Sequence, residues 1–262
     1  GTVTVGAWFI ATTDANNGNI NMNSFAGQAI HLNTHGTGNA TVVNDTQLVF
    51  GNTHMTIGGD LSVTATTGQI TDSVNHNGSV TVAGTSSFTT SQNNADIILD
   101  DTDHVFTGAV ALNTTGSSGH ATIDNGTTAF IVAQSSVGGN LTLTSGHASG
   151  ITDSGTVTVG GWLRATTDAN SGVINLGTLA VDAGIHLNTH GTGNATAVND
   201  AGFLFGGNGS TVGGNLNVTA TTGNMTNNND GSVTVAGTSS FTTSANNADI
   251  ILDDTDHAFT GA

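Results

Sequence analysis

The feature that most constrains the fold of this chain is an internal repeat about 154 residues long. The opening segment, GTVTVGAWFIATTDANNGNINM, returns from Gly155 onward as GTVTVGGWLRATTDANSGVINL. Residues 79–109 return as residues 232–262, with 29 of 31 positions identical. A long period of this kind is typical of solenoids, in which each unit buries its apolar face only by stacking on its neighbours. We therefore expect residues 1–154 to form a first long repeat and residues 155–262 a second, incomplete copy, in one continuous solenoid.

A shorter repeat lies inside the long one. Short triplets alternate apolar and small polar residues, which predicts strands with one buried face. They occupy residues 3–5, 61–63, 80–82, 110–112, 141–143 and 157–159. With one more start near Phe25, they divide the 154 residues into six units of about 26 residues on average, in steps of 16 to 36. Glycine pairs and Asn-rich stretches between the triplets indicate turns.

These units predict an all-β fold, a parallel β-helix of about ten coils of variable length. Each coil would hydrogen-bond to the next at about 4.8 Å, so that the triplets form one internal column. The composition agrees. The 38 Gly residues and the single Lys or Arg disfavour helices, and the absence of Pro leaves the hydrogen-bond ladder between strands uninterrupted. A pair of β-sandwich domains, the second one truncated, is the competing all-β interpretation.

Several segments carry a family resemblance. The stretches SVTVAGTSSFTT, ILDDTDHVFTGAVALNTTG, SVGGNLTLTSG and GITDSGTVTVGG resemble the strand repeats of filamentous haemagglutinin-like exoproteins, which are giant repetitive adhesins of bacterial surfaces. The resemblance covers essentially the whole chain. It implies a right-handed parallel β-helix, an extracellular or cell-surface location, and a scaffolding or adhesive role.

Charge and hydropathy exclude several classes of protein. The net charge of −17, with a single basic residue, excludes a nucleic-acid binder, which needs cations to neutralise phosphates. No apolar run approaches the roughly 18 residues that membrane insertion requires. The first five residues lack the basic and apolar regions of a signal peptide. The absence of Cys excludes disulfides and thiolate metal sites.

One dense polar cluster is a candidate metal site. It comprises Asp96, Asp100, Asp101, Asp103 and His104, and it recurs as Asp249, Asp253, Asp254, Asp256 and His257. Oxygen ligands at this density suit calcium, so the candidate ligands are Asp100, Asp101 and Asp103 with their counterparts Asp253, Asp254 and Asp256. The order is not that of an EF-hand loop, and solvated turns in which Asp caps backbone amides are the alternative. We expect no other cofactor and no catalytic residues.

Histidines and tryptophans also recur between the copies. His31 and His35, like His186 and His190, have the spacing of a zinc-binding helix. In an extended strand such residues lie about 13 Å apart, so we expect them to face solvent instead. Trp8 and Trp162 occupy matching places, where we expect packing at a coil corner in preference to a sugar-stacking surface.

The function that these observations favour is structural. We expect an extracellular β-helical scaffold, either a segment of a giant adhesin or the protomer of a cell-surface fibre. Its partners would be further copies of itself, stacked end to end, and glycans of a host surface or matrix. A polysaccharide-acting β-helix enzyme is the alternative. Two observations disfavour it: a lyase needs several basic groups and the chain has one Arg, and a catalytic site is usually singular whereas every Asp cluster belongs to the repeat. Ice binding by Thr-x-Thr motifs, such as residues 64–66 and 219–221, is a third possible function. The irregular spacing of these motifs along the chain disfavours it.

Overall fold

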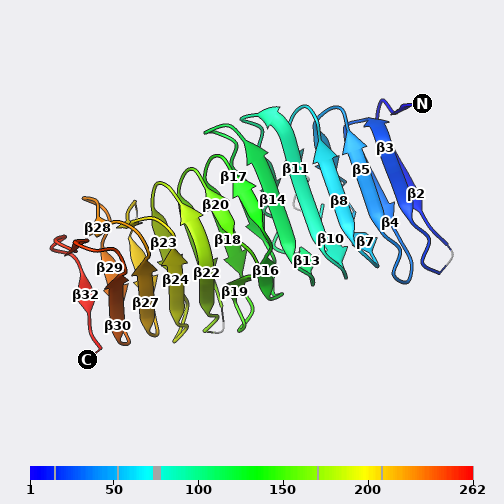
Figure 1. Ribbon diagram of the computed structural model, residues 1–262. Coiled ribbons are helices and arrows are strands. Elements are labelled where there is room, and N and C mark those ends of the chain that lie inside the picture. Colours follow the sequence, from blue (N-terminus) through cyan, green and yellow to red (C-terminus); the bar gives the residue numbers. More distant parts are fainter. Residues whose placement is uncertain (15, 52, 73–77, 170, 208, 262) are drawn as a thin grey trace.

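The computed structural model describes residues 1–14, 16–51, 53–72, 78–169, 171–207 and 209–261. The chain is an all-β parallel solenoid of about 11 turns, which confirms the predicted fold class. The two termini lie at opposite ends of the rod (Figure 1). The described residues form no helix, and hence none that could cross a membrane.

Two parallel sheets run the length of the rod, and the chain passes from one to the other in every coil. In the described residues, sheet A has 14 strands: β1 (Val3–Thr4), β3 (Ile20–Ala26), β5 (Ala40–Asn44), β8 (Leu61–Ala65), β11 (Ser86–Asn93), β14 (Val110–Thr115), β16 (Phe130–Val132), β17 (Ser135–Val137), β19 (Ile151–Asp153), β20 (Val157–Val159), β22 (Ile174–Val181), β24 (Ala195–Asn199), β27 (Leu216–Ala220) and β30 (Ser239–Thr243).

Sheet B has 18 strands in the part of the chain that the structure describes: β2 (Trp8–Thr12), β4 (Ala29–Asn33), β6 (Leu48–Phe50), β7 (Met55–Ile57), β9 (Ile70–Thr71), β10 (Val80–Val82), β12 (Ile97–Leu99), β13 (Val105–Phe106), β15 (Ala121–Asp124), β18 (Leu141–Ser145), β21 (Leu163–Thr167), β23 (Ile185–Asn188), β25 (Phe203–Phe205), β26 (Ser210–Val212), β28 (Met225–Asn227), β29 (Val233–Val235), β31 (Ile250–Ile251) and β32 (Ala258–Phe259).

The coils are more uniform than the triplets predicted. Paired residues on adjacent coils lie as few as 19 positions apart, as Phe25 and Asn44 do, and as many as 27, as Ile70 and Ile97 do. Sheet A takes seven steps from β3 to β22, so the long repeat holds seven coils of about 22 residues instead of six of about 26. The count of six was wrong because the triplets do not all lie on one sheet: residues 61–63 lie in sheet A and residues 80–82 in sheet B.

The core is one column of inward-facing side chains. Along most strands, buried and partly exposed residues alternate, as they must when one face of each sheet lines the interior. Phe50, Phe88 and Phe106 stack edge to face through three coils, at centroid distances of 6.0 and 5.6 Å. The second copy repeats this stack as Phe205, Phe241 and Phe259, at 6.1 and 5.5 Å. The long repeat therefore reproduces the core as well as the surface.

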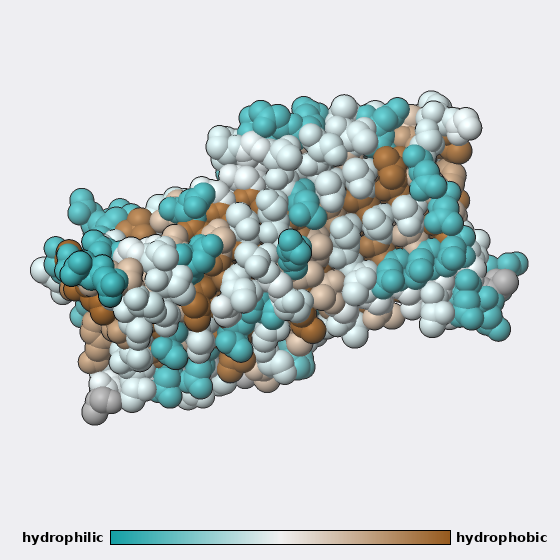
Figure 2. Space-filling view, viewed as in Figure 1, coloured by the Kyte–Doolittle hydropathy of each residue, from teal (hydrophilic) through white to brown (hydrophobic). Residues whose placement is uncertain are grey.

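A ladder of polar side chains holds the coil corners together. The Asn19 Oδ1 atom accepts the Asn39 backbone N–H at 2.8 Å, and the Asn39 Oδ1 atom accepts that of Asp60 at 2.7 Å. The Asp60 Oδ1 atom continues the series by accepting the Thr85 N–H at 2.7 Å. These bonds satisfy backbone groups where the strands end, which explains why Asn and Asp recur at coil spacing. Figure 2 shows the resulting surface, which is mostly polar or near neutral in hydropathy, with scattered apolar residues.

Candidate functional site

The Asp cluster of the first copy is built around a buried hydrogen-bond chain. The His104 Nδ1 atom accepts the Val80 N–H at 3.0 Å, so Nε2 carries the proton and donates to Asp72 Oδ2 at 3.1 Å. Asp72 Oδ2 also accepts the Asp101 N–H at 2.8 Å. All three side chains are buried, with His104 completely so. These hydrogen bonds link two successive coils at a corner. The repeat pattern in the sequence did not single out Asp72 as a member of the cluster.

Asp101 itself holds a local turn. Its Oδ1 atom accepts the Asp103 N–H at 3.0 Å, while Oδ2 is buried and has no hydrogen-bond partner in the described part of the chain. Asp100 and Asp103 are exposed. Asp96 lies at the opposite corner of the coil, between β11 and β12, where its Oδ1 atom accepts the His120 N–H at 2.8 Å. Turn capping by Asp, the alternative interpretation of this cluster, is thus present at Asp101.

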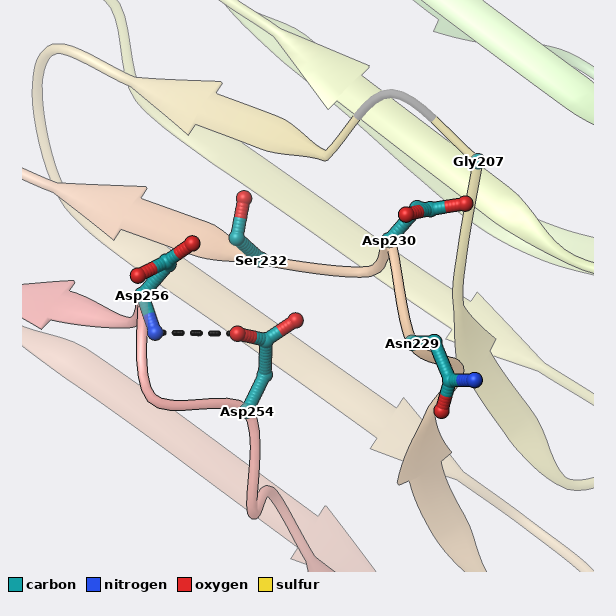
Figure 3. Close-up of a pocket in the computed structure, with 6 residues that line it drawn as sticks. All are labelled: Gly207, Asn229, Asp230, Ser232, Asp254 and Asp256. Atoms are coloured by element: carbon teal, nitrogen blue, oxygen red, sulfur yellow. Dashed lines mark hydrogen bonds between the residues drawn. The ribbon is translucent and has the colours of Figure 1, made fainter.

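The equivalent cluster of the second copy opens onto a hollow of about 500 Å³ near the C-terminal end (Figure 3). The hollow is lined by Gly207, Asn229, Asp230, Ser232, Asp254 and Asp256. Here too the first Asp of the turn caps it, because Asp254 Oδ1 accepts the Asp256 N–H at 2.9 Å. Asp253 is exposed, and its N–H donates to the Asn227 side chain at 3.0 Å.

The two clusters differ although their sequences are nearly identical. Asn227 stands where the first copy has Asp72, so the His257 Nε2 atom is buried without a hydrogen-bond partner among the described residues. Asp254 is half-buried, whereas Asp101 is 1% exposed. Within the ranges that the structure describes, no three His, Cys, Asp or Glu side chains form a group that could hold a metal ion. Calcium binding at the six Asp residues named from the sequence stays a prediction.

A further acidic hollow lies at mid-rod. Its volume is about 270 Å³, and it is lined by Asp124, Asp168, Thr102, Gly126, Thr127, Gly146 and Ala169. Burial raises the pKa of Asp124, the Gly126 N–H lowers it, and Asp168 raises it again; the net direction is upward. No sequence motif points to Asp124 and Asp168 as a pair, because they lie on different coils.

The histidine pairs do not converge on a shared ligand. His31 contacts the Asn33 side chain at 2.8 Å and Thr53 Oγ1 at 2.9 Å, whereas His35 bonds to the Thr13 carbonyl of the preceding coil. His35 and His190 are exposed, as expected. The prediction was wrong for His186, which is only 8% exposed, because the Trp162 ring of the preceding coil lies 5.6 Å from its own.

The two ends of the rod expose residues that are buried elsewhere in the chain. Ile250 in β31 is 46% exposed, whereas Ile97, its equivalent in the first copy, is completely buried. Phe259 and its equivalent Phe106 differ in the same way, at 42% and 0%. The difference has one cause: β14 and β15 cover the coil of Ile97, and no described strand covers that of Ile250.

The N-terminal end shows the same relationship. Val3 in β1 is 46% exposed, while its equivalent Val157 in β20 is completely buried between β17 and β22. In the described part of the chain, β1 and β2 each pair with a single strand. Both ends therefore present unpaired strand edges together with open core side chains.

Comparison with known proteins yields one match. A family model described as repeats of unknown function (DUF5649) matches residues 37–113 and again residues 192–262. These two segments are more than half of the chain and correspond to each other within the long repeat. No curated protein and no solved structure gives a significant match.

Proposed function

Since this chain belongs to the family of repeats of unknown function (DUF5649), we propose a function from its structure: a structural scaffold that extends by coil-on-coil stacking. The proposed setting is extracellular, as a segment of a giant adhesin or the protomer of a cell-surface fibre. The resemblance to filamentous haemagglutinin-like repeats supports that setting, and so does a net charge of −17, which keeps the rods apart laterally.

The observation that carries the proposal is the contrast between Ile97 and Ile250. The same side chain in the same local sequence is fully buried where a further coil covers it and 46% exposed where none does. Burying apolar surface stabilises by roughly 25 cal/mol per Å², and an added coil also pairs the open N–H and C=O groups of the edge strands. A further coil of this repeat type would therefore bury the exposed core side chains and pair the open strands at each end.

Head-to-tail stacking is the arrangement that these ends favour. The β30–β32 coil and the β1–β2 coil are different surfaces, so their contact is heterologous and generates a linear array. All strands in the rod are parallel, so a stacked copy continues both sheets without reversing the chain direction. The proposed partners are thus further copies of this chain or coils of the same repeat type.

Sedimentation velocity over a range of protein concentrations tests the proposal. We expect species larger than the monomer to grow with concentration in the wild-type protein. Ile250→Lys, which places a charge at the open end of the core, should abolish them. Ser136→Lys is the matched control, because Ser136 is exposed on the outer face of β17, which pairs with β14 and β20 far from either end. A wild-type protein that stays monomeric throughout, or a control variant that blocks association equally, would contradict end-to-end stacking.

A further inference from the structure

A hollow on the outer face of sheet B surrounds the only Lys or Arg residue of the chain, Arg164. Its volume is about 250 Å³, and its lining is Asn140, Thr142, Trp162, Arg164, His186 and Gly207. Thr142, Arg164 and His186 are register partners on the adjacent strands β18, β21 and β23. Neighbouring parallel strands lie about 4.8 Å apart, so these side chains form one rank across three coils.

The Trp162 ring packs closely against two glycines, Gly184 and Gly206. A Cβ atom at Gly184 would lie 2.0 Å from the Trp162 ring, and one at Gly206 would lie 2.4 Å from it. The ring therefore lies against the backbone of the next two coils, and only glycine leaves room for it. The Trp162 backbone is fixed as well, because its N–H donates to Asn140 Oδ1 at 2.9 Å. The result is an aromatic ring held in place beside the hollow.

His186 forms the far wall of the hollow. Ile185 and Leu187 point inward, so His186 lies on the outer face, yet it is only 8% exposed because Trp162 covers it. Its Nδ1 atom donates to the Gly209 carbonyl at 3.3 Å. Burial lowers the pKa of His186; the bond to Gly209 acts in the opposite direction, and Arg164 lowers the pKa further. His186 is therefore uncharged near neutral pH, and Arg164 is the cation in the lining of the hollow.

The two copies of the long repeat differ at this place. Four residues of the first copy are replaced around the hollow: Ile10 by Arg164, Ala29 by Gly184, Asn52 by Gly207 and His54 by Gly209. The replacements supply the cation, make room for the ring of Trp162, and bring a glycine carbonyl to His186. Trp8, the counterpart of Trp162, is 46% exposed, and Ile10 stands at the position equivalent to Arg164. The cation is thus specific to the second copy, whereas the contact between the Trp ring and a glycine is shared, since a Cβ atom at Gly51 would lie 2.3 Å from the Trp8 ring. In the described part of the chain no strand of sheet B precedes β2, so the wall that Asn140 and Thr142 form has no counterpart beside Trp8.

We infer that this hollow binds a sugar that carries a carboxylate, that is, a uronic acid residue of an acidic polysaccharide. The planar guanidinium of Arg164 matches a carboxylate with two parallel hydrogen bonds. The fixed Trp162 ring offers an amphipathic flat surface to the apolar face of a sugar ring, and Thr142 and Asn140 carry polar groups for its hydroxyls. Gly207 also lines the hollow of Asp230, Asp254 and Asp256, so these carboxylates oppose such a ligand, and salt at physiological ionic strength, with a Debye length of about 8 Å, weakens that repulsion. The site lies on the side of the rod, so this inference is independent of end-to-end stacking.

Calorimetric titration with trigalacturonate, and in parallel with a neutral galactotriose of the same linkage, tests the inference. We expect trigalacturonate to bind at least about tenfold more tightly than the neutral trisaccharide, since a charge-assisted bidentate pair is worth that much or more. Arg164→Ile should remove this preference. The variant restores the residue that the first copy carries at Ile10, so we expect it to fold.

Thr41→Ile on the outer face of sheet A is the matched control and should leave binding unchanged. Tryptophan fluorescence in a Trp8→Phe background gives a second readout, because Trp162 is then the only indole. We expect trigalacturonate to change that emission. Equal affinity for the two trisaccharides, no binding of either, or an Arg164→Ile variant that still prefers the acidic one would overturn the inference.

Discussion

The side chain of Asn44 hydrogen-bonds to both polar groups of the Gly27 backbone in the preceding coil. Its Oδ1 atom accepts the Gly27 N–H at 3.1 Å, and its Nδ2 atom donates to the Gly27 carbonyl at 2.8 Å. The second copy repeats the relationship between Asn199 and Val181, at 2.8 and 3.0 Å. In both places the strand register shifts beside the Asn residue, so its amide replaces ladder bonds that the backbone does not make.

Replacing Asn199 should therefore destabilise the rod strongly. Asn199→Leu leaves the N–H and C=O groups of Val181 buried without partners, and each such group costs about 1–3 kcal/mol. We expect the free energy of unfolding in urea to fall by about 2–4 kcal/mol. Asn217→Leu, on the exposed outer face, is the control and should change it by about 0.5 kcal/mol or less. Equal losses for the two variants would show that the buried amide has no special role.

The two copies offer a matched test of core burial. Ile97→Ala removes a completely buried side chain and should cost about 2–5 kcal/mol. Ile250→Ala removes the same group from the open end, where Ile250 is 46% exposed, and in dilute protein should cost less than half as much. Urea unfolding below the association range measures both. A loss at Ile250 as large as that at Ile97 would mean that the terminal coil is covered in solution.

Gly184→Ala should displace the Trp162 ring. The added methyl group would lie 2.0 Å from the ring, so the ring must move away from the Gly184 backbone and become more exposed; the first copy has Ala29 at this place. We expect a red-shifted tryptophan emission in a Trp8→Phe background and a loss of about 1–3 kcal/mol in stability. Gly177→Ala is the control, because a Cβ atom there would meet nothing closer than 3.9 Å. An unchanged emission spectrum in Gly184→Ala would contradict the proposed seating of the ring.

Asp124 predicts a specific dependence of stability on pH. Its pKa is raised in the folded rod, chiefly because burial disfavours the charged carboxylate. A raised folded pKa gives stability that is complete below the unfolded value of 3.8 and is lost as the pH rises through the folded value. At pH 7, Asp124→Asn should therefore raise the melting temperature, and its amide oxygen can still accept the Gly126 N–H. The gain should disappear near pH 3, where Asp124 is protonated in both states; a gain that persists there would refute the burial explanation.

The sequence predicted the fold class because strand alternation and the long repeat are local properties of the chain. It could not give the coil length, since triplets such as 61–63 and 80–82 look alike although they lie on different sheets. Burial of His186 was missed for a related reason: it depends on Trp162, a neighbour in space from the coil before. The contrast between Asp101 and Asp254 was also beyond a sequence argument, because near-identical local sequences acquire different burial from their places along the rod.

Electron microscopy of the purified protein at increasing concentration tests the stacking scaffold most directly. About 11 turns at roughly 4.8 Å each give a rod about 50 Å long. We predict unbranched rods of constant width whose lengths are multiples of about 50 Å, with single rods dominating when Ile250→Lys blocks one end. Single rods at every concentration, or rods joined side by side, would contradict the account.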